Sequence, residues 1–143
     1  MLDITSAQKI LHDAGIRLTP QRLMVVEALA GNRTHPTVEN IYELVRRKYP
    51  TVSLATVYHT VTLLARYGLI RELHAGKDGL RCDPDTSQHA HAYCRQCGKI
   101  ADVELSSKLC VKEETLDNFL IAGVEVSLFG LCNDCRAQQE PAS

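Results

Sequence analysis

The sequence lacks any long apolar segment: no stretch approaches the roughly 20 consecutive apolar residues that a membrane-spanning helix requires. The first fifteen residues lack the basic start and apolar core of a secretory leader, and no internal repeat or low-complexity tract is evident. These absences predict a cytoplasmic protein with no membrane partner. What is present is a chain of 143 residues, 45% of them hydrophobic, which suffices for one ordinary folded domain or two small ones.

The chain also lacks a strong net charge, but its formal charge of −1 conceals an asymmetry. Residues 1–83 contain 11 lysines and arginines against 8 acids, a formal charge of +3, whereas residues 84–143 contain 5 against 9, a formal charge of −4. The first part is therefore suited to an anionic partner and the second part is not.

Four segments of the first part combine helical spacing of apolar residues with end signals: residues 5–15, 18–31, 35–50 and 53–68. We expect Thr5 and Gln8 to cap the first helix as a capping box, Thr19 and Pro20 to begin the second, and Ser53 to cap the fourth. Two short extended runs around glycines within residues 69–83 predict a hairpin. Helices closed by a hairpin indicate a winged helix-turn-helix, although other small helical domains share the pattern.

The second part has a different pattern. Strands are predicted at residues 89–94, 99–105 and 124–132, with a helix at 106–123 and a disordered tail at 138–143. A polar, proline-containing stretch near residues 83–88 is suited to a hinge. We therefore predict an α+β protein with three parts: a winged-helix domain (1–84), a hinge (85–88) and an α/β domain (89–143).

Four of the six cysteines form two C-x2-C pairs that are separated by 34 residues. In a chain without a secretory leader, paired thiols at this spacing are more often metal ligands than disulfides. Gly98 follows the first pair and can take the positive φ that such a turn often needs. The alternative, a redox-active C-x-x-C couple, would place one pair at the start of a helix in a βαβ unit. We expect a tetrahedral structural Zn²⁺ site formed by Cys94, Cys97, Cys132 and Cys135.

His89 and His91 lie two residues apart in an expected strand, so their side chains should leave the same face. Cys94, three positions beyond His91, should point to the opposite face, which predicts that histidines and cysteines serve different centres. A simpler interpretation is that both histidines are exposed residues of an edge strand. Asp83 and Asp102 flank the pair, and nitrogen and oxygen donors suit Fe(II), Mn(II) or Zn(II). Spacing alone does not select a further ligand among His12, His35, His59 and His74.

Five segments occur in an order that resembles the ferric uptake regulator family of metal-responsive repressors: "RLTPQR", "HPTVENIY", "SLATVYHTVTLLARYGLI", "RCDPDTSQHAHAYCRQCGKIADVE" and "GLCNDC". The resemblance extends from about Gly15 to Cys135. It implies an N-terminal winged-helix DNA-binding domain, a C-terminal α/β dimerisation domain, and a metal-loaded homodimer that binds double-stranded operator DNA.

By position, the resemblance implies that the paired cysteines hold the structural zinc. It also implies that regulatory Fe²⁺ or Mn²⁺ is bound by His35, Asp83, His89, His91 and Asp102. Aspartate at positions 83 and 102 is more similar to the peroxide-sensing branch (PerR) than to iron sensors, which usually carry glutamate. In that branch, oxidation of a ligand histidine by hydrogen peroxide releases metal and then DNA, and His35 and His89 are implied as the oxidised residues.

Some positions depart from family patterns. Gln88 and Ala90 stand where some iron sensors carry ligands of a second regulatory-type site, so we expect that site to be absent. The thiol of Cys82 lies beside Asp83 in sequence and raises the alternative of a softer, zinc-preferring site. Cys110, on the apolar side of an expected helix, is interpreted as a small buried residue.

The basic first part is expected to meet phosphates, and the fourth helix is expected to meet bases or backbone. The candidate DNA contacts are Arg17, Arg22, Thr56, Tyr58 and His59. For any one of the basic residues, a solvated helix face is the alternative interpretation.

Two other functions are compatible with the same residues. One is a sensor of iron, manganese or zinc availability without peroxide chemistry. The other is a zinc-dependent hydrolase, which we disfavour because no acid is evidently available as general base and the DNA-binding part would be unexplained. The sequence therefore predicts a regulator and not an enzyme.

Overall fold

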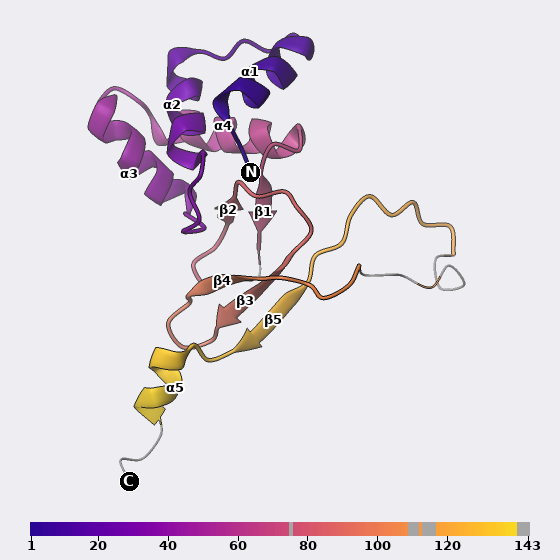
Figure 1. Cartoon of the computed structure of the whole chain (residues 1–143). Helices are drawn as coiled ribbons and strands as arrows, with labels where there is room; N and C mark the ends of the chain where they lie inside the picture. The colour runs from indigo at the N-terminus through magenta and orange to yellow at the C-terminus, as the bar shows by residue number, and fades with distance from the viewer. Residues whose placement is uncertain (75, 109–111, 113–116, 140–143) are drawn as a thin grey trace. The chain divides into compact units, whose positions relative to one another are not determined.

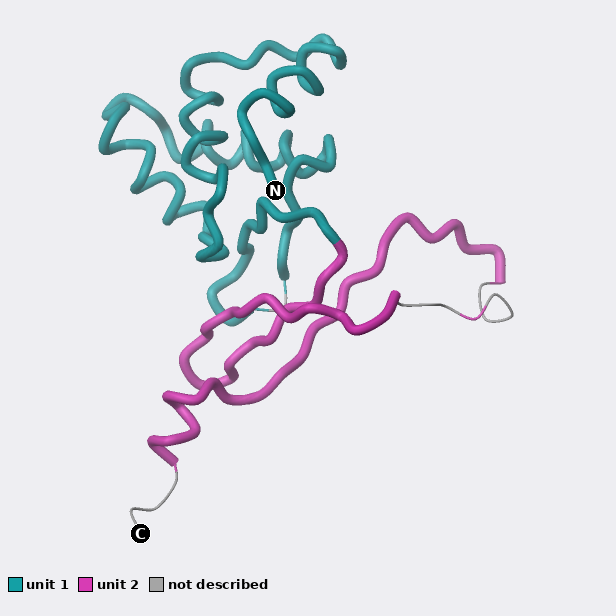
Figure 2. The backbone as a smooth tube through the Cα atoms, viewed as in Figure 1, with its two compact units in different colours: residues 1–87 teal, residues 88–143 magenta. Residues whose placement is uncertain are grey.

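The computed structural model describes residues 1–74, 76–108, 112 and 117–139. The chain divides into two compact units, Met1–Ser87 and Gln88–Ser143, which we call unit 1 and unit 2 (Figure 2). Among the described residues, none of the helices combines the length and the hydropathy needed to span a membrane.

Unit 1 contains four helices (Figure 1): α1 (Ile4–Asp13), α2 (Pro20–Leu29), α3 (Val38–Lys48) and α4 (Leu54–Arg66). The expected caps of α2 and α4 are confirmed, since Thr19 accepts a hydrogen bond from the Arg22 amide and Ser53 accepts one from the Thr56 amide. Thr37 and Asn40 form a reciprocal capping box at the start of α3. These side chains satisfy amides that would otherwise lack partners at the helix ends, so each helix begins at a position set by the local sequence.

A two-stranded antiparallel hairpin completes unit 1, with β1 (Arg71–Leu73) paired to β2 (Arg81–Asp83). The core of the unit is built from the apolar stripes of the helices, with fully buried side chains that include Leu11, Leu29, Ile41 and Leu64. Helices packed around such a core and followed by a hairpin confirm the predicted winged helix-turn-helix fold.

Unit 2 contains a three-stranded sheet in the order β4-β3-β5 and one helix. The central strand β3 (Ala90–Cys94) pairs antiparallel with β4 (Ile100–Val103) and parallel with β5 (Ser127–Gly130), and α5 (Asn133–Gln139) follows. The three predicted strands are present, each within its predicted segment. The mixed helix-and-sheet fold class is therefore confirmed.

The N-cap of α1 differs from the prediction. Asp3, in extended conformation, accepts a hydrogen bond from the Ser6 amide, and Thr5 already lies inside the helix. Because the Asp3 carboxylate caps the Ser6 amide, helix α1 begins at Ile4, earlier than the Thr5–Gln8 capping box predicted. The hydrogen bond also lowers the pKa of Asp3, because it stabilises the charged carboxylate.

The predicted helix over residues 106–123 is wrong for the residues described there, since Asp117–Asn118 form a turn and residues 119–123 are irregular. The apolar residues Phe119 and Leu120 in this segment are 77% and 97% exposed. A short helix in water depends on burial of an apolar face, and these two side chains are not buried. Cys110 lies outside the described residues, as do residues 140–143. Gln138 and Gln139 end α5, so the predicted disordered tail begins too early.

Four large apolar side chains of the unit 1 helices are 37–40% exposed: Ile4, Ile10, Leu44 and Leu54.

Candidate metal centres

The two cysteine pairs converge within unit 2. Cys94 ends β3 and Cys97 lies in the turn that follows, while Cys132 comes directly after β5 and Cys135 lies in α5. One sulfur from each of the four lies within 4.8 Å of the others. Because β3 and β5 are parallel neighbours, paired up to Cys94 and Gly130, both knuckles leave the sheet at the same end.

The sulfur geometry fits a zinc ion better than a disulfide. The Sγ atoms of Cys97 and Cys132 are 3.7 Å apart, and all four thiols are free. A tetrahedron of sulfurs around Zn²⁺ has edges of roughly 3.8 Å, whereas a disulfide requires about 2.0 Å. Gly98 has the expected positive φ of 76° and donates its amide to the Cys94 carbonyl at 3.0 Å, which closes the first knuckle.

The electrostatics of the four thiols also favour a cation. Hydrogen bonds from the backbone at Cys132 and Cys97 lower the pKa of the Cys94 thiol to about 5, so its thiolate forms readily. Burial, followed by contacts with the other three thiols, raises the pKa of Cys135 to about 12. Crowded sulfurs resist carrying negative charge together unless a divalent ion compensates them, and this set has the composition of a structural zinc site.

A histidine and an aspartate of unit 1 form a buried pair. His35 lies just before α3 and Asp83 ends β2, and the Nε2 atom of His35 is 3.9 Å from Oδ2 of Asp83. The Cys82 amide donates to the Pro36 carbonyl at 2.9 Å, which holds the two segments together. Oδ1 of Asp83 accepts the Asp85 amide at 2.9 Å, so the two carboxylate oxygens have different roles.

Unit 2 contributes a second cluster of nitrogen and oxygen donors. His91 and Asp102 are direct partners across the β3–β4 pair, and His91 is 1% exposed. Nε2 of His89 lies 3.0 Å from Nε2 of His91 and 3.4 Å from Oδ1 of Asp102. Donor atoms around a small divalent ion are separated by roughly 3.0–3.4 Å, so these three side chains can ligate one ion together.

Strand geometry separates the two clusters of unit 2. His91 and Cys94 lie in the same strand at positions of opposite parity, and each belongs to a different group of potential ligands. The sequence analysis predicted separate histidine and cysteine centres from this alternation of side chains along the strand.

Cys82 is not placed as a ligand. Its side chain is fully buried in the apolar core of unit 1, and burial raises the pKa of its thiol to about 12. Neighbouring strand residues point to opposite faces, so Cys82 turns inward where Asp83 turns toward His35. The alternative of a sulfur-containing regulatory site is therefore not supported.

The ferric uptake regulator family model matches residues 13–129 of this chain. The chain belongs to that family. The match ends before the second cysteine pair, so the family assignment does not depend on Cys132 and Cys135.

The chain is similar along nearly its whole length to proteins named for peroxide regulation. It is 32% identical over 139 residues to the peroxide operon regulator of Bacillus subtilis, covering 96% of each chain. It is 33% identical over 128 residues to the peroxide-responsive repressor PerR of Staphylococcus saprophyticus, covering 88% of this chain and 86% of the relative.

Solved structures of the family have the same fold. The Helicobacter pylori ferric uptake regulator, described as having three functional metal-binding sites, matches with a TM-score of 0.73 and 22% identity over 96% of this chain and 93% of its own. The Campylobacter jejuni peroxide stress regulator matches with a TM-score of 0.64 and 26% identity over 94% of this chain and 100% of its own.

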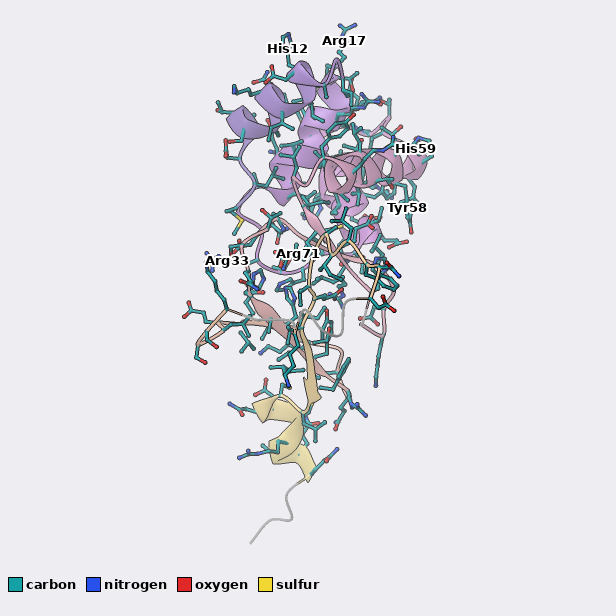
Figure 3. All side chains as sticks on the ribbon, turned by 90° about the vertical axis from the view of Figure 1, so that its right-hand side faces the viewer. His12, Arg17, Arg33, Tyr58, His59 and Arg71 are labelled. Atoms are coloured by element: carbon teal, nitrogen blue, oxygen red, sulfur yellow. The ribbon has the colours of Figure 1, made fainter. Side chains whose placement is uncertain are left out.

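The predicted DNA-contacting residues occupy two regions of unit 1. Figure 3 shows Arg17 beside His12 at one end of the unit, apart from Tyr58 and His59 on α4. Tyr58 donates its hydroxyl to Oε1 of Glu39 at 3.2 Å. The remaining two residues are engaged locally: Arg22 donates to the Arg17 carbonyl at 2.7 Å, and the Thr56 hydroxyl contacts that of Ser53 at 2.9 Å.

The sequence analysis did not single out Arg81 or Asp78. Arg81 donates a hydrogen bond to the backbone carbonyl of the candidate ligand His35, and Asp78 accepts one from Arg81. Arg81 lies two residues before Asp83 in β2, and therefore on the same face of the strand. The two-residue spacing from Asp83 could have identified Arg81 from the sequence. An arginine on the same strand face as a candidate ligand can donate hydrogen bonds to the segments beside that ligand.

Proposed function

We propose that this chain is a metal-dependent, DNA-binding transcriptional repressor that senses hydrogen peroxide through oxidation of the histidines that bind its regulatory metal. The family membership and the names of its relatives support a transcription regulator. The observation that carries the proposal is the presence of two donor sets of different chemistry, one of four thiols and one of histidines and aspartates.

The four cysteines hold structural zinc in this proposal. They join the end of β3 to the segment that begins α5, and so link the parallel strands β3 and β5 at one end of the sheet. A closed thiolate site leaves no position for a reactant, which suits a permanent role.

The regulatory centre takes His35 and Asp83 from unit 1 and His89, His91 and Asp102 from unit 2. When these residues share one ion, the two units lose freedom of movement relative to each other, and the orientation of α4 relative to unit 2 is restricted. Metal binding and DNA binding are then coupled, provided that the metal-bound arrangement is also the one that fits the operator.

We infer peroxide sensing from the aspartates at positions 83 and 102, which resemble the peroxide-sensing branch, and from the names of the relatives. The proposed histidine and aspartate ligands would hold Fe(II), which would supply the electrons for cleaving the O–O bond of hydrogen peroxide next to the ligand imidazoles. His35 and His89 are the proposed sites at which oxygen is added. The Asp85 amide donates to Oδ1 of Asp83, and Oδ2 lies 3.9 Å from Nε2 of His35, so this carboxylate is held beside the proposed ligand histidine.

The DNA-binding form is proposed to be a homodimer. Dimeric helix-turn-helix proteins place two recognition helices on half-sites about 34–36 Å apart or at multiples of that spacing. In unit 2, the β5 segment exposes apolar side chains, with Leu128 46%, Phe129 51% and Leu131 39% accessible. A second copy that covers this strand would remove them from water.

The test compares Fe(II)-loaded and Mn(II)-loaded protein after peroxide treatment. Peptide mass spectrometry should find added oxygen on His35 and His89 only in the Fe(II) form, and a gel shift should show loss of DNA binding only in that form. The DNA probe is a duplex selected from random sequences by the Mn(II)-loaded protein. Retained DNA binding and unmodified histidines in both forms would leave a sensor of metal availability without peroxide chemistry.

A further inference from the structure

The candidate ligand His35 has an unusual backbone conformation. Its φ is 50°, in the left-handed region that residues other than glycine seldom adopt. It also precedes Pro36, and a residue before proline normally has an extended conformation with negative φ. The chain therefore has little intrinsic preference for the conformation that aims the His35 imidazole, and surrounding contacts must maintain it.

Arg81 makes such a contact from the neighbouring strand. Its Nη1 donates to the His35 carbonyl oxygen at 3.1 Å, and its side chain is only 17% exposed. The backbone of Arg81 also forms a bridge with Thr37, so the strand and the segment before α3 lie side by side (Figure 1). Arg81 thus restrains the backbone of His35 through the His35 carbonyl group. Arg81 itself lies in β2, the strand that also contains Asp83.

Asp78 orients the other arm of the same guanidinium. Its Oδ2 accepts from Nη2 of Arg81 at 2.6 Å, a short charge-assisted hydrogen bond. Asp78 belongs to the turn of the β1–β2 hairpin and is 56% exposed. Because the guanidinium is planar and rigid, fixing one arm fixes the direction of the other.

We propose that Arg81 is a positioning residue of the regulatory metal site: it holds His35 in its ligating conformation, and Asp78 orients Arg81. This inference rests on the proposed function, because it assumes that His35 binds the regulatory metal. It assigns part of the metal affinity to two residues that provide no ligand atom, one of them in the hairpin turn.

The experiment measures Mn(II) affinity of the full chain in its zinc-loaded form. Arg81→Gln should weaken Mn(II) binding by about 10- to 100-fold, the range typical of groups that orient metal ligands. Asp78→Asn retains an acceptor but removes the charge, so it should weaken binding by a smaller factor of about threefold, since the hydrogen bond loses its charge assistance. Zinc content should be unchanged in both variants.

Arg46→Gln is the matched control. Arg46 pairs with Glu43 three residues earlier, as Arg81 pairs with Asp78, but this pair lies exposed on α3 and contacts no candidate ligand. Its loss should leave Mn(II) affinity unchanged. A second control is the double variant His35→Ala with Arg81→Gln, which should bind Mn(II) no more weakly than His35→Ala alone, because Arg81 acts only through His35.

The outcomes separate the two proposals. If His35→Ala binds Mn(II) as the wild type does, His35 is not a ligand and the proposed function itself fails. If His35→Ala loses affinity but Arg81→Gln and Asp78→Asn do not, the positioning role is wrong and the proposed function stands. If Arg81→Gln fails to fold, Asp78→Asn decides, since its exposed side chain can be changed without disturbing the core. Additive losses in the double variant would also overturn the positioning role.

Discussion

His91 and Asp102 are direct partners across the β3–β4 pair, and this register places Nε2 of the imidazole 3.5 Å from Oδ1 of the carboxylate. Because the two residues face each other across adjacent strands, their side chains are neighbours on one face of the sheet, and neither residue lies in a loop. Their relative position is therefore set by the backbone hydrogen bonds between β3 and β4, which would give the unit 2 part of the proposed regulatory centre a rigid base.

Replacement of His91 with alanine should separate metal sensing from folding. We expect His91→Ala to keep its zinc and its dimeric state but to bind Mn(II) at least about 100-fold more weakly, beyond the effect of residues that merely orient ligands. Metal-dependent DNA binding should then be lost in a gel shift. His12→Ala is the control, because that side chain is 89% exposed on α1, and it should behave as the wild type. Normal Mn(II) affinity in His91→Ala would remove this residue from the ligand set.

Loss of one zinc thiolate should unfold unit 2. The free energy of binding structural zinc is coupled to folding and amounts to about 10–16 kcal/mol in small zinc domains. We expect Cys97→Ser to lack zinc in elemental analysis, to elute as a monomer, and to show early loss of unit 2 in urea while unit 1 unfolds normally. Cys82→Ala, which changes a cysteine outside the cluster, should keep a full complement of zinc. A zinc-loaded Cys97→Ser dimer is the result that contradicts the structural role.

Much of the fold could be predicted because its signals are local. Thr19, Pro20 and Ser53 each mark a helix start within one turn of sequence, and alternation within residues 89–94 marks a strand. The predicted capping residue of α1 was wrong because Asp3, two residues before Thr5, is also a favourable N-cap residue and accepts the Ser6 amide. The segment 106–123 has helical periodicity, but the apolar side chains described at its end, Phe119 and Leu120, lie exposed rather than packed.

The candidate sites were only partly predictable from spacing. Both cysteine pairs and the H-x-H pair are visible as local motifs, whereas His35 and Arg81 are separated by 46 residues and meet only in the folded unit. Only the family resemblance selects His35 from among His12, His35, His59 and His74. The role of Cys82 depended on whether its side chain turns toward the core or toward Asp83, which only the strand register settles.

A charge on β5 should prevent dimerisation. Phe129 is half exposed, stacks on Tyr93 with ring centroids 5.6 Å apart, and lies 5.2 Å from the guanidinium of Arg95. In Phe129→Glu the new carboxylate can pair with Arg95 within one copy, so we expect a folded, zinc-loaded protein. Its dimer dissociation constant should rise by at least about 30-fold, the effect of losing an interfacial aromatic hot spot. Analytical ultracentrifugation measures this constant.

The control for that variant is Leu44→Glu, which places the same charge at a 40% exposed leucine of α3 in unit 1. It should remain a dimer. If Phe129→Glu also remains a dimer at the same concentrations, the β5 surface is not the dimer interface.

The pKa of the Tyr58 hydroxyl depends on its contact with Glu39. The negative charge of the Glu39 carboxylate, together with the hydrogen bond between the two side chains, raises the pKa of Tyr58 above its ordinary value. Because the folded-state pKa lies above the unfolded one, this contact contributes its full stability below pH of about 10 and loses it as the pH rises through the folded-state pKa.

Glu39→Gln removes the charge and should lower the pKa of Tyr58 toward the ordinary tyrosine value. Absorbance at alkaline pH, taken as a difference from Tyr58→Phe to isolate this one phenol, measures the change. Glu43→Gln, on the same helix but paired with Arg46, should leave the titration of Tyr58 unchanged. An unaltered Tyr58 titration in Glu39→Gln would mean that the side chain is free in solution, and α4 would then present it to DNA without the restraint from α3.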